Sequence, residues 1–347
     1  MTAKTNQGRR RSLRRWVTLL CFGIGLACGI VSTAESRQAS LRVALIGFTH
    51  ASSRDSIALF NKVEGRLNAS LSSDPRVLLV DDSIVRPALL GLGYDGSINM
   101  NREEARRVGS AIGCDFFITG KLEVLTRSER KGASHEEAFA GVMIVDGRTG
   151  DLAVFDFISE KAPTREVALN TVEKSMVERA TGYIDRIIQV RARGQLPGSA
   201  APTNHGTTAG DLIEDMPNED SPRAVGFKPP QFLNRVKPGY TSEAEQADIT
   251  ATVEVMVVFR STGEMGGIEV TRWAGFGLDE SAASAIRRLQ YTPALRDGKP
   301  ISIRAMIRYN FRRVNDVSQQ PEAPAPEPPD KPERDLRPIF KPTYRRP

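Results

Sequence analysis

The chain has 347 residues and a formal net charge of +6, a length that suits two ordinary domains with additional tails. Residues 1–34 contain six basic residues and no acidic one, so the rest of the chain is formally neutral. A neutral body gives no electrostatic reason for nucleic-acid binding, and we therefore expect no nucleic-acid partner.

The N-terminus is typical of an export segment. A basic stretch up to Arg15 is followed by Trp16–Ala34, which contains no charged residue. The small residues Ser32-Thr33-Ala34 predict signal cleavage between Ala34 and Glu35. If it is not cut, this segment would form a helix of roughly 28 Å, just under a hydrocarbon thickness of about 30 Å. The alternatives are therefore a cleaved periplasmic protein and an inner-membrane anchored protein, with the body in the periplasm in both cases.

The cysteines fit an exported protein. Cys21 and Cys28 lie in the export segment, which leaves Cys114 alone in the body. Neither an internal disulfide nor a CxxC metal site can form, and Cys114 is expected to be a small buried apolar residue. The box Gly25-Leu26-Ala27-Cys28 resembles a lipoprotein cleavage site only in part, because Gly25 stands where a large aliphatic residue is needed.

Residues 40–194 alternate strand-like and helix-like patterns, which predicts an α/β domain. Short apolar runs predict strands at Leu41–Phe48, Val77–Val80, Asp115–Leu125, Phe139–Val145 and Leu152–Ile158. Helical periodicity predicts helices around Leu59–Leu71, at Arg102–Ile112 and from about Thr164 to Arg193.

Composition divides the rest of the chain. Residues 195–227 are rich in Gly, Pro, Ser, Thr, Asn and Asp, which predicts a flexible linker. Residues 228–314 form a second compact unit. The tail, 315–347, has nine prolines after residue 316 and is expected to be disordered or polyproline-like.

The second unit has the pattern of a small α+β domain. Alternating apolar residues predict a strand over Ala251–Phe259, and the turn at Gly263 returns the chain into a paired strand at Gly267–Val270. A helix follows, with Asp279 as its expected N-terminal cap. Ile301–Phe311 is the third strand, so we expect a three-stranded antiparallel sheet with helices.

The order of the predicted elements and several short sequence motifs together resemble the TonB C-terminal domain. On these motifs the chain is identified as a TonB family protein. The matching phrases are Lys237-Pro238-Gly239-Tyr240, Glu243-Ala244, Gly263, Gly275, Leu278-Asp279, Ala282-Ala283, Ala285-Ile286, Tyr291-Thr292-Pro293-Ala294 and Asp297-Gly298-Lys299-Pro300. Three positions depart from the family pattern. Thr241 replaces a second proline, Ile249-Thr250 stands where a glycine is common, and Trp273 occupies the place of a serine.

Residues 40–194 resemble the exported α/β domains of curli-assembly CsgG-like and TolB-N-terminal-like proteins. The phrases that carry this resemblance are Arg42-Val43-Ala44-Leu45, Ala111-Ile112-Gly113-Cys114-Asp115 and the strand that leads from Phe116 to Gly120. The resemblance implies a mixed sheet in this first domain.

The TonB-like resemblance implies a protein partner in the cell envelope, either an outer-membrane receptor or another copy of the chain. A short antiparallel sheet leaves an edge whose N–H and C=O groups can pair with an added strand. We expect that edge at Tyr309, Asn310 and Phe311. The alternative is that Tyr309 and Phe311 only pack the sheet.

A motor-coupled, membrane-anchored energy transducer is the main alternative function. The resemblance to that family implies a functional histidine in the membrane helix, and Trp16–Ala34 contains none. The long proline-rich spacer is also missing between the export segment and the second domain. We therefore favour an exported adaptor over a transducer.

Motifs that could carry catalysis are weak. Gly91–Gly96 matches G-x-G-x-x-G, but no helix is expected to begin directly after it, as a dinucleotide site needs. His50, His135 and His205 have no partner at metal-ligand spacing. Asp81-Asp82 at a strand end is expected to cap a turn. We therefore predict no catalytic residue, no cofactor and no metal, and hence not an enzyme.

Overall fold

A computed structural model of the chain describes residues 40–50, 57–128, 134–194 and 212–313. The chain divides into two compact units, Met1–Ser40 and Leu41–Pro347. Both sheets described below belong to the second unit. The predicted cleavage site at Ala34 and Glu35, His205 and the tail 315–347 lie outside the described residues.

Among the described residues, no helix combines the length and the apolar character that a membrane crossing requires.

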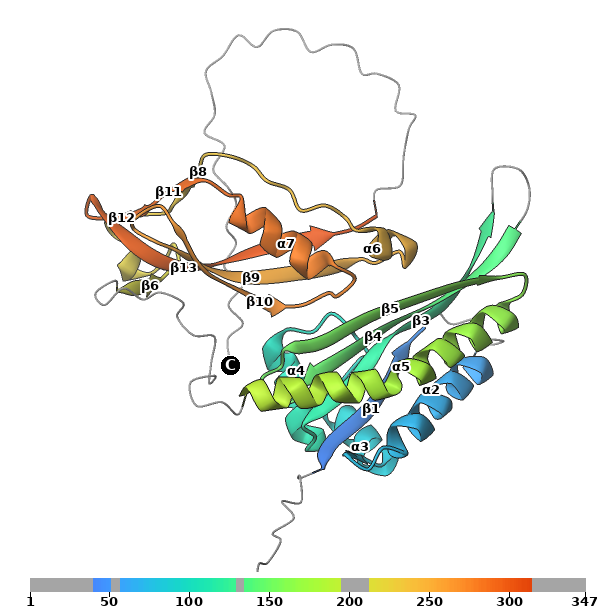
Figure 1. Ribbon diagram of the computed structural model, residues 1–347. Coiled ribbons are helices and arrows are strands. Elements are labelled where there is room, and N and C mark those ends of the chain that lie inside the picture. Colours follow the sequence, from blue (N-terminus) through green and yellow to red (C-terminus); the bar gives the residue numbers. More distant parts are fainter. Residues whose placement is uncertain (1–39, 51–56, 129–133, 195–211, 314–347) are drawn as a thin grey trace, which may run out of the picture. The chain divides into compact units, whose positions relative to one another are not determined.

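The first sheet is mixed, with five strands in the order β2-β1-β3-β4-β5 (Figure 1). They are β1 (Leu41–Thr49), β2 (Val77–Leu79), β3 (Phe116–Ser128), β4 (Ser134–Asp146) and β5 (Leu152–Ala162). β1 pairs in parallel with β2 and β3, whereas β3, β4 and β5 form an antiparallel meander. The predicted strands and the mixed character of the sheet are confirmed.

Two helices, α2 (Ile57–Ser72) and α5 (Arg165–Gly194), cover one face of this sheet (Figure 1). Their apolar stripes recur every three or four residues, so that each helix presents a single apolar face. Phe60, Val63, Leu67 and Leu71 of α2 belong to the same buried cluster as Val172 and Met176 of α5 and Val142 and Ile144 of β4.

The opposite face is covered by α3 (Asp82–Leu92), by α4 (Arg102–Ile112) and by residues from the C-terminal part of the chain. One hydrophobic cluster contains Phe139 and Met143 of β4 together with Val255 and Phe276. Because both faces are covered, ten consecutive residues of β4, from Glu137 to Asp146, are buried.

The sequence patterns did not predict α3. Asp81 caps its N-terminus by accepting a hydrogen bond from the backbone N–H of Ser83 at 2.8 Å, as expected for a turn-capping acid. Gly93 ends the helix in the left-handed region, with φ of 65°. The motif Gly91–Gly96 therefore spans the C-terminal end of a helix, whereas a dinucleotide site needs a turn from a strand into the start of a helix.

The second sheet has the order β10-β9-β13-β12-β7, with β6 also pairing with β13. Its strands are β6 (Ile213–Asp215), β7 (Phe227–Lys228), β9 (Ala251–Phe259), β10 (Met265–Arg272), β12 (Ala294–Arg296) and β13 (Lys299–Phe311). A separate pair joins β8 (Gln231–Phe232) to β11 (Tyr291–Thr292). The helices are α6 (Ser242–Gln246), α7 (Leu278–Arg287) and a 3-10 turn at Pro222–Ala224.

This sheet has six strands rather than the three expected. The extra strands are two or three residues long, too short to give an alternating pattern, and they are assigned only by their pairing with β13 and β12. Two of them, β6 and β7, lie within the segment predicted as a flexible linker. That prediction is wrong for 213–215 and 227, because these residues pair with the second sheet, and it stays a prediction for 195–211.

The loop Trp273–Gly277 joins the C-terminal part to the first sheet. Phe276 is fully buried, and its ring lies 4.9 Å from Phe155 and 5.7 Å from Phe157, both on β5. Gly141 on β4 makes room for this ring, since a Cβ there would lie 2.6 Å from its Cζ atom. Phe276 thus packs directly on β4 and on the edge strand β5 of the first sheet.

We expect Phe276→Ala to lower the free energy of unfolding by about 3–5 kcal/mol, because it leaves a cavity at this packed site. Chemical denaturation measures the change. Leu90→Ala is the control, since Leu90 is 80% exposed and its truncation should cost less than about 0.5 kcal/mol. Equal, small effects of both changes would contradict the packing described.

Candidate functional site

Part of one side of β13 has no paired strand among the described residues. β13 pairs with β9 without a register shift from Ile303 to Phe311. On the other side, β12 pairs with residues up to Ile301 and β6 pairs with Ser302–Arg304. Beyond Arg304, the described part of the chain places no further strand on that side of β13. The stretch Ala305–Phe311 is called the open edge below.

Two contacts show which backbone groups face outward there. The carbonyl of Arg304 accepts a hydrogen bond from the N–H of Met216, so it points away from β9. At the other end, the backbone of Thr252, which lies opposite Asn310, is held by the Asn99 side chain on the side away from β13. Because backbone direction alternates along a strand, the N–H and C=O of Met306 and Asn310 point to the open side.

The three residues predicted for partner binding lie at the end of this edge, with their side chains on different faces. Phe311 is buried and Tyr309 is half-buried, and their rings lie 6.5 Å apart. Burial raises the pKa of Tyr309. Asn310 is exposed and its Oδ1 accepts a hydrogen bond from Thr252 Oγ1 at 2.9 Å. The edge therefore offers main-chain groups, whereas the two aromatic rings pack the sheet.

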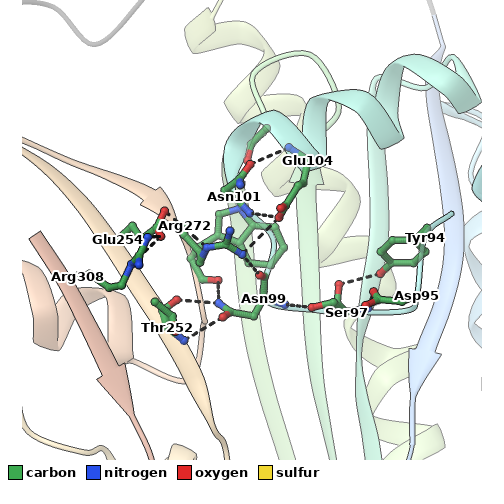
Figure 2. Close-up of polar contacts among 12 residues, drawn as sticks. Tyr94, Asp95, Ser97, Asn99, Asn101, Glu104, Thr252, Glu254, Arg272 and Arg308 are labelled. Carbon is green, nitrogen blue, oxygen red and sulfur yellow. Dashed lines mark hydrogen bonds and ion pairs between the residues drawn. The ribbon is translucent and has the colours of Figure 1, made fainter. Parts of the chain in front are cut away.

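The exposed face of the sheet carries an ion-pair cluster. Glu254 on β9 is only 7% exposed, and its Oε1 accepts a hydrogen bond from Arg308 at 2.6 Å. Its Oε2 lies 3.6 Å from Arg272 on β10, so two arginines from the neighbouring strands share one carboxylate (Figure 2). Two positively charged partners compensate the cost of burying this carboxylate.

Asn99 connects the first part of the chain to β9. Its Nδ2 donates to the carbonyls of Thr252 and Trp273, at 2.9 and 2.7 Å, and its Oδ1 accepts from the N–H of Thr252 at 2.9 Å (Figure 2). The amide thus satisfies both backbone groups of Thr252, as a neighbouring strand would. Arg272 adds a bond to the Asn99 carbonyl at 2.7 Å.

Trp273 explains one departure from the TonB-like pattern. The side chain is 2% exposed, and its Nε1 donates to the carbonyl of Gly150, in the turn between β4 and β5, at 3.1 Å. A serine there could not reach across to the first sheet. The sequence showed that Trp273 departs from the family pattern but not which contact the side chain makes. Nothing in the sequence singled out Asn99.

A groove adjoins the end of the open edge. Its volume is about 560 Å³, and its lining comes from Asn99, Thr250, Ala251, Thr252, Asn310, Phe311 and Arg312. The lining is mostly polar, with amide and hydroxyl groups and one guanidinium. The groove lies at the start of β9 and the end of β13, and it shares Asn310 and Phe311 with the open edge.

The other singled-out residues do not gather into a site. His50 stacks on Phe60 with 4.9 Å between ring centroids, and His135 lies on β4. Cys114 is buried, as predicted, and burial raises the pKa of its thiol to about 12. Among the described residues, no group of three or more His, Cys, Asp or Glu side chains could hold a metal ion.

Asp279 has a different role from the expected helix cap. The N-cap residue of α7 is Gly277, and Asp279 lies in the first turn. Its carboxylate accepts hydrogen bonds from the backbone N–H groups of Ala274 and Gly275, at 2.8 and 2.9 Å. It therefore holds the Trp273–Gly277 loop rather than the helix. Burial raises the pKa of Asp279 to about 6, against the lowering effect of these two bonds.

Comparison with known proteins supports the TonB-like interpretation of the C-terminal part of the chain. Residues 236–312 match the family model described as Gram-negative bacterial TonB protein C-terminal, which spans β9, β10, α7 and β13. This confirms the resemblance for that part of the chain. Among curated proteins, none matches the chain.

Several solved structures are similar to the chain at low sequence identity. The hypothetical protein CT253 from Chlamydia trachomatis has 13% identity and a TM-score of 0.33, covering 42% of this chain and 98% of its own. Lipoprotein GNA1162 from Neisseria meningitidis has 14% identity and a TM-score of 0.31, with coverage of 41% and 99%. The LpoB C-terminal domain from Salmonella enterica has 11% identity and a TM-score of 0.26, with coverage of 35% and 82%. The CsgG-like and TolB-N-terminal-like resemblance of residues 40–194 stays a prediction.

We expect the stability contributed by Asp279 to fall as the pH rises. Because its folded pKa of about 6 is above the ordinary 3.8, the folded state binds this proton more tightly than the unfolded chain. The contribution is fully present below about pH 4 and lost as the pH passes about 6.

The measurement is the free energy of unfolding of the protein and of Asp279→Asn, which cannot titrate, at pH 4 and pH 7. The difference between the two should shrink by at most about 3 kcal/mol over this range. A difference that stays constant with pH would contradict the raised pKa.

Proposed function

We propose that this chain is an exported cell-envelope protein that binds a protein partner by adding a strand of that partner to the open edge of β13. The observation that carries the proposal is the unpaired stretch Ala305–Phe311 within residues that match the TonB C-terminal family model. The family resemblance implies an N-terminal segment of an outer-membrane receptor as the partner, with a second copy of this chain as the alternative.

Strand addition suits this edge for a physical reason. An exposed strand with outward N–H and C=O groups gains main-chain hydrogen bonds when an extended peptide pairs with it. Pairing with β9 from Ile303 to Phe311 and the packing of Tyr309 and Phe311 hold this strand in its extended form. Because β13 is already ordered, binding of the peptide does not carry the entropic cost of ordering β13.

The proposed function is binding, without catalysis or a cofactor. The first part of the chain, residues 40–194, serves as a folded body that holds β9 through Asn99 and the Trp273–Gly277 loop. We favour an adaptor over a motor-coupled transducer because the uncharged N-terminal segment contains no histidine. Periplasmic location of the body follows from the export segment.

We expect Met306→Pro to abolish partner binding and Met306→Ala to preserve it. Proline removes the N–H that points to the open side, while leaving the bonds to β9 intact. Alanine changes the same side chain but keeps the N–H. Titration with labelled N-terminal peptides of the outer-membrane receptors of the same organism, and sedimentation for self-association, measure binding.

Circular dichroism should show that both variants are folded. Loss of binding in both variants would mean that the Met306 side chain, not the edge, makes the contact. Normal binding by Met306→Pro would contradict strand addition at this edge.

A separate prediction concerns the N-terminus of the mature protein. We expect the mature protein in the periplasmic fraction to begin at Glu35, because Ser32-Thr33-Ala34 fits signal cleavage. N-terminal sequencing of washed membrane and periplasmic fractions measures this. An intact Met1 chain in the inner membrane would contradict cleavage and favour the anchored transducer.

A further inference from the structure

The side of β13 that carries the open edge already binds one strand of the same chain, next to the open edge, and that strand is acidic. β6 pairs in parallel with Ser302–Arg304, directly in line with the open edge. Asp215 of β6 lies 2.8 Å from Arg304, and Glu214 lies 2.8 Å from Arg296. The last bond of this pairing runs from the N–H of Met216 to the carbonyl of Arg304. The side of β13 next to the open edge thus accepts an extended acidic segment.

The exposed face of β13 continues this basic pattern. Arginines recur every fourth residue, at Arg304, Arg308 and Arg312. The first is paired with Asp215 and the second with Glu254. No ion pair found within the described ranges involves Arg312, which is exposed. A carboxylate is therefore supplied from within the chain at the first two positions of the series.

Arg312 also lines the groove at the end of the edge. Thr252 and Asn310 lie on the same face, and Asn99 contributes from the first part of the chain. The Asn99 amide is fixed by its three hydrogen bonds to Thr252 and Trp273. Both N–H groups of the Asn99 amide donate to Thr252 and Trp273, and the Thr252 hydroxyl donates to Asn310 Oδ1. The donors that remain to bind a group in the groove are the Arg312 guanidinium and the Asn310 Nδ2, and a carboxylate is a chemical group that both can bind.

We propose that the strand bound at the open edge belongs to an acidic extended segment of another protein, and that one of its carboxylates occupies the groove beside Arg312. The inference rests on the proposed strand addition and adds the chemical class of the partner. It also gives residues 40–194 a part in recognition, because Asn99 forms one wall of the groove.

The test begins with the full-length protein, purified in mild detergent, and a displayed library of random short peptides. Selected peptides are then synthesised in pairs, with glutamate or glutamine at each acidic position. We expect the selected peptides to be acidic and the Glu-to-Gln change at one position to weaken binding by about tenfold or more. Arg312→Gln should cause a similar loss and make the two peptides of that pair equivalent.

Arg313→Gln is the matched control, since it removes the same charge from the adjacent residue, which does not line the groove. Its effect should stay within about twofold. Met306→Pro should abolish binding of every selected peptide.

The outcomes separate the two proposals. Binding that Met306→Pro abolishes, but that shows no acidic preference or responds equally to Arg312→Gln and Arg313→Gln, overturns the inference and leaves strand addition in place. Peptide binding that ignores Met306→Pro overturns both. Self-association abolished by Met306→Pro, with no peptide selected, overturns the inference in favour of a second copy.

Discussion

The packing of the Trp273–Gly277 loop on the first sheet is the contact on which the rest of the arrangement depends. A sheet with helices on one face leaves its other face apolar, and that face must be covered. α3 and α4 cover part of it, and the ring of Phe276 covers β4 and β5 beside Gly141. Trp273 and Asp279 hold the loop by hydrogen bonds, which gives the apolar contact a single geometry.

The same contact determines what the second sheet can offer to a partner. Asn99 and β10 hold β9 on one side, and β9 pairs with β13 on the other. This pairing sets, residue by residue, which backbone groups of β13 point outward. Proteins usually protect an exposed strand edge with charges, prolines or a covering segment. Here β6 covers the first part of that side, arginines flank it, and the pairing ends before the open edge.

The predictions of the long strands and of one helix were confirmed because they depend on the periodicity of apolar residues alone. The strands around Val43, Phe117 and Val255 and the helix at Arg102–Ile112 follow from alternating or three-to-four spaced apolar residues. The short strands were missed because two or three residues cannot show a period. The role of Asp279 was predicted wrongly, since an acid near a helix start can bond either to the helix or to the loop before it.

By itself, the sequence determined the order of the long elements, the TonB-like character of the last domain and the position of its third strand. These are local properties or residue patterns of a single segment. The tertiary structure decided which side of β13 is open, that Tyr309 and Phe311 point inward, and that Trp273 and Asn99 join distant segments. The reason is physical: backbone direction, burial and side-chain reach depend on neighbours brought together from up to 174 positions apart in the chain, and no local pattern records them.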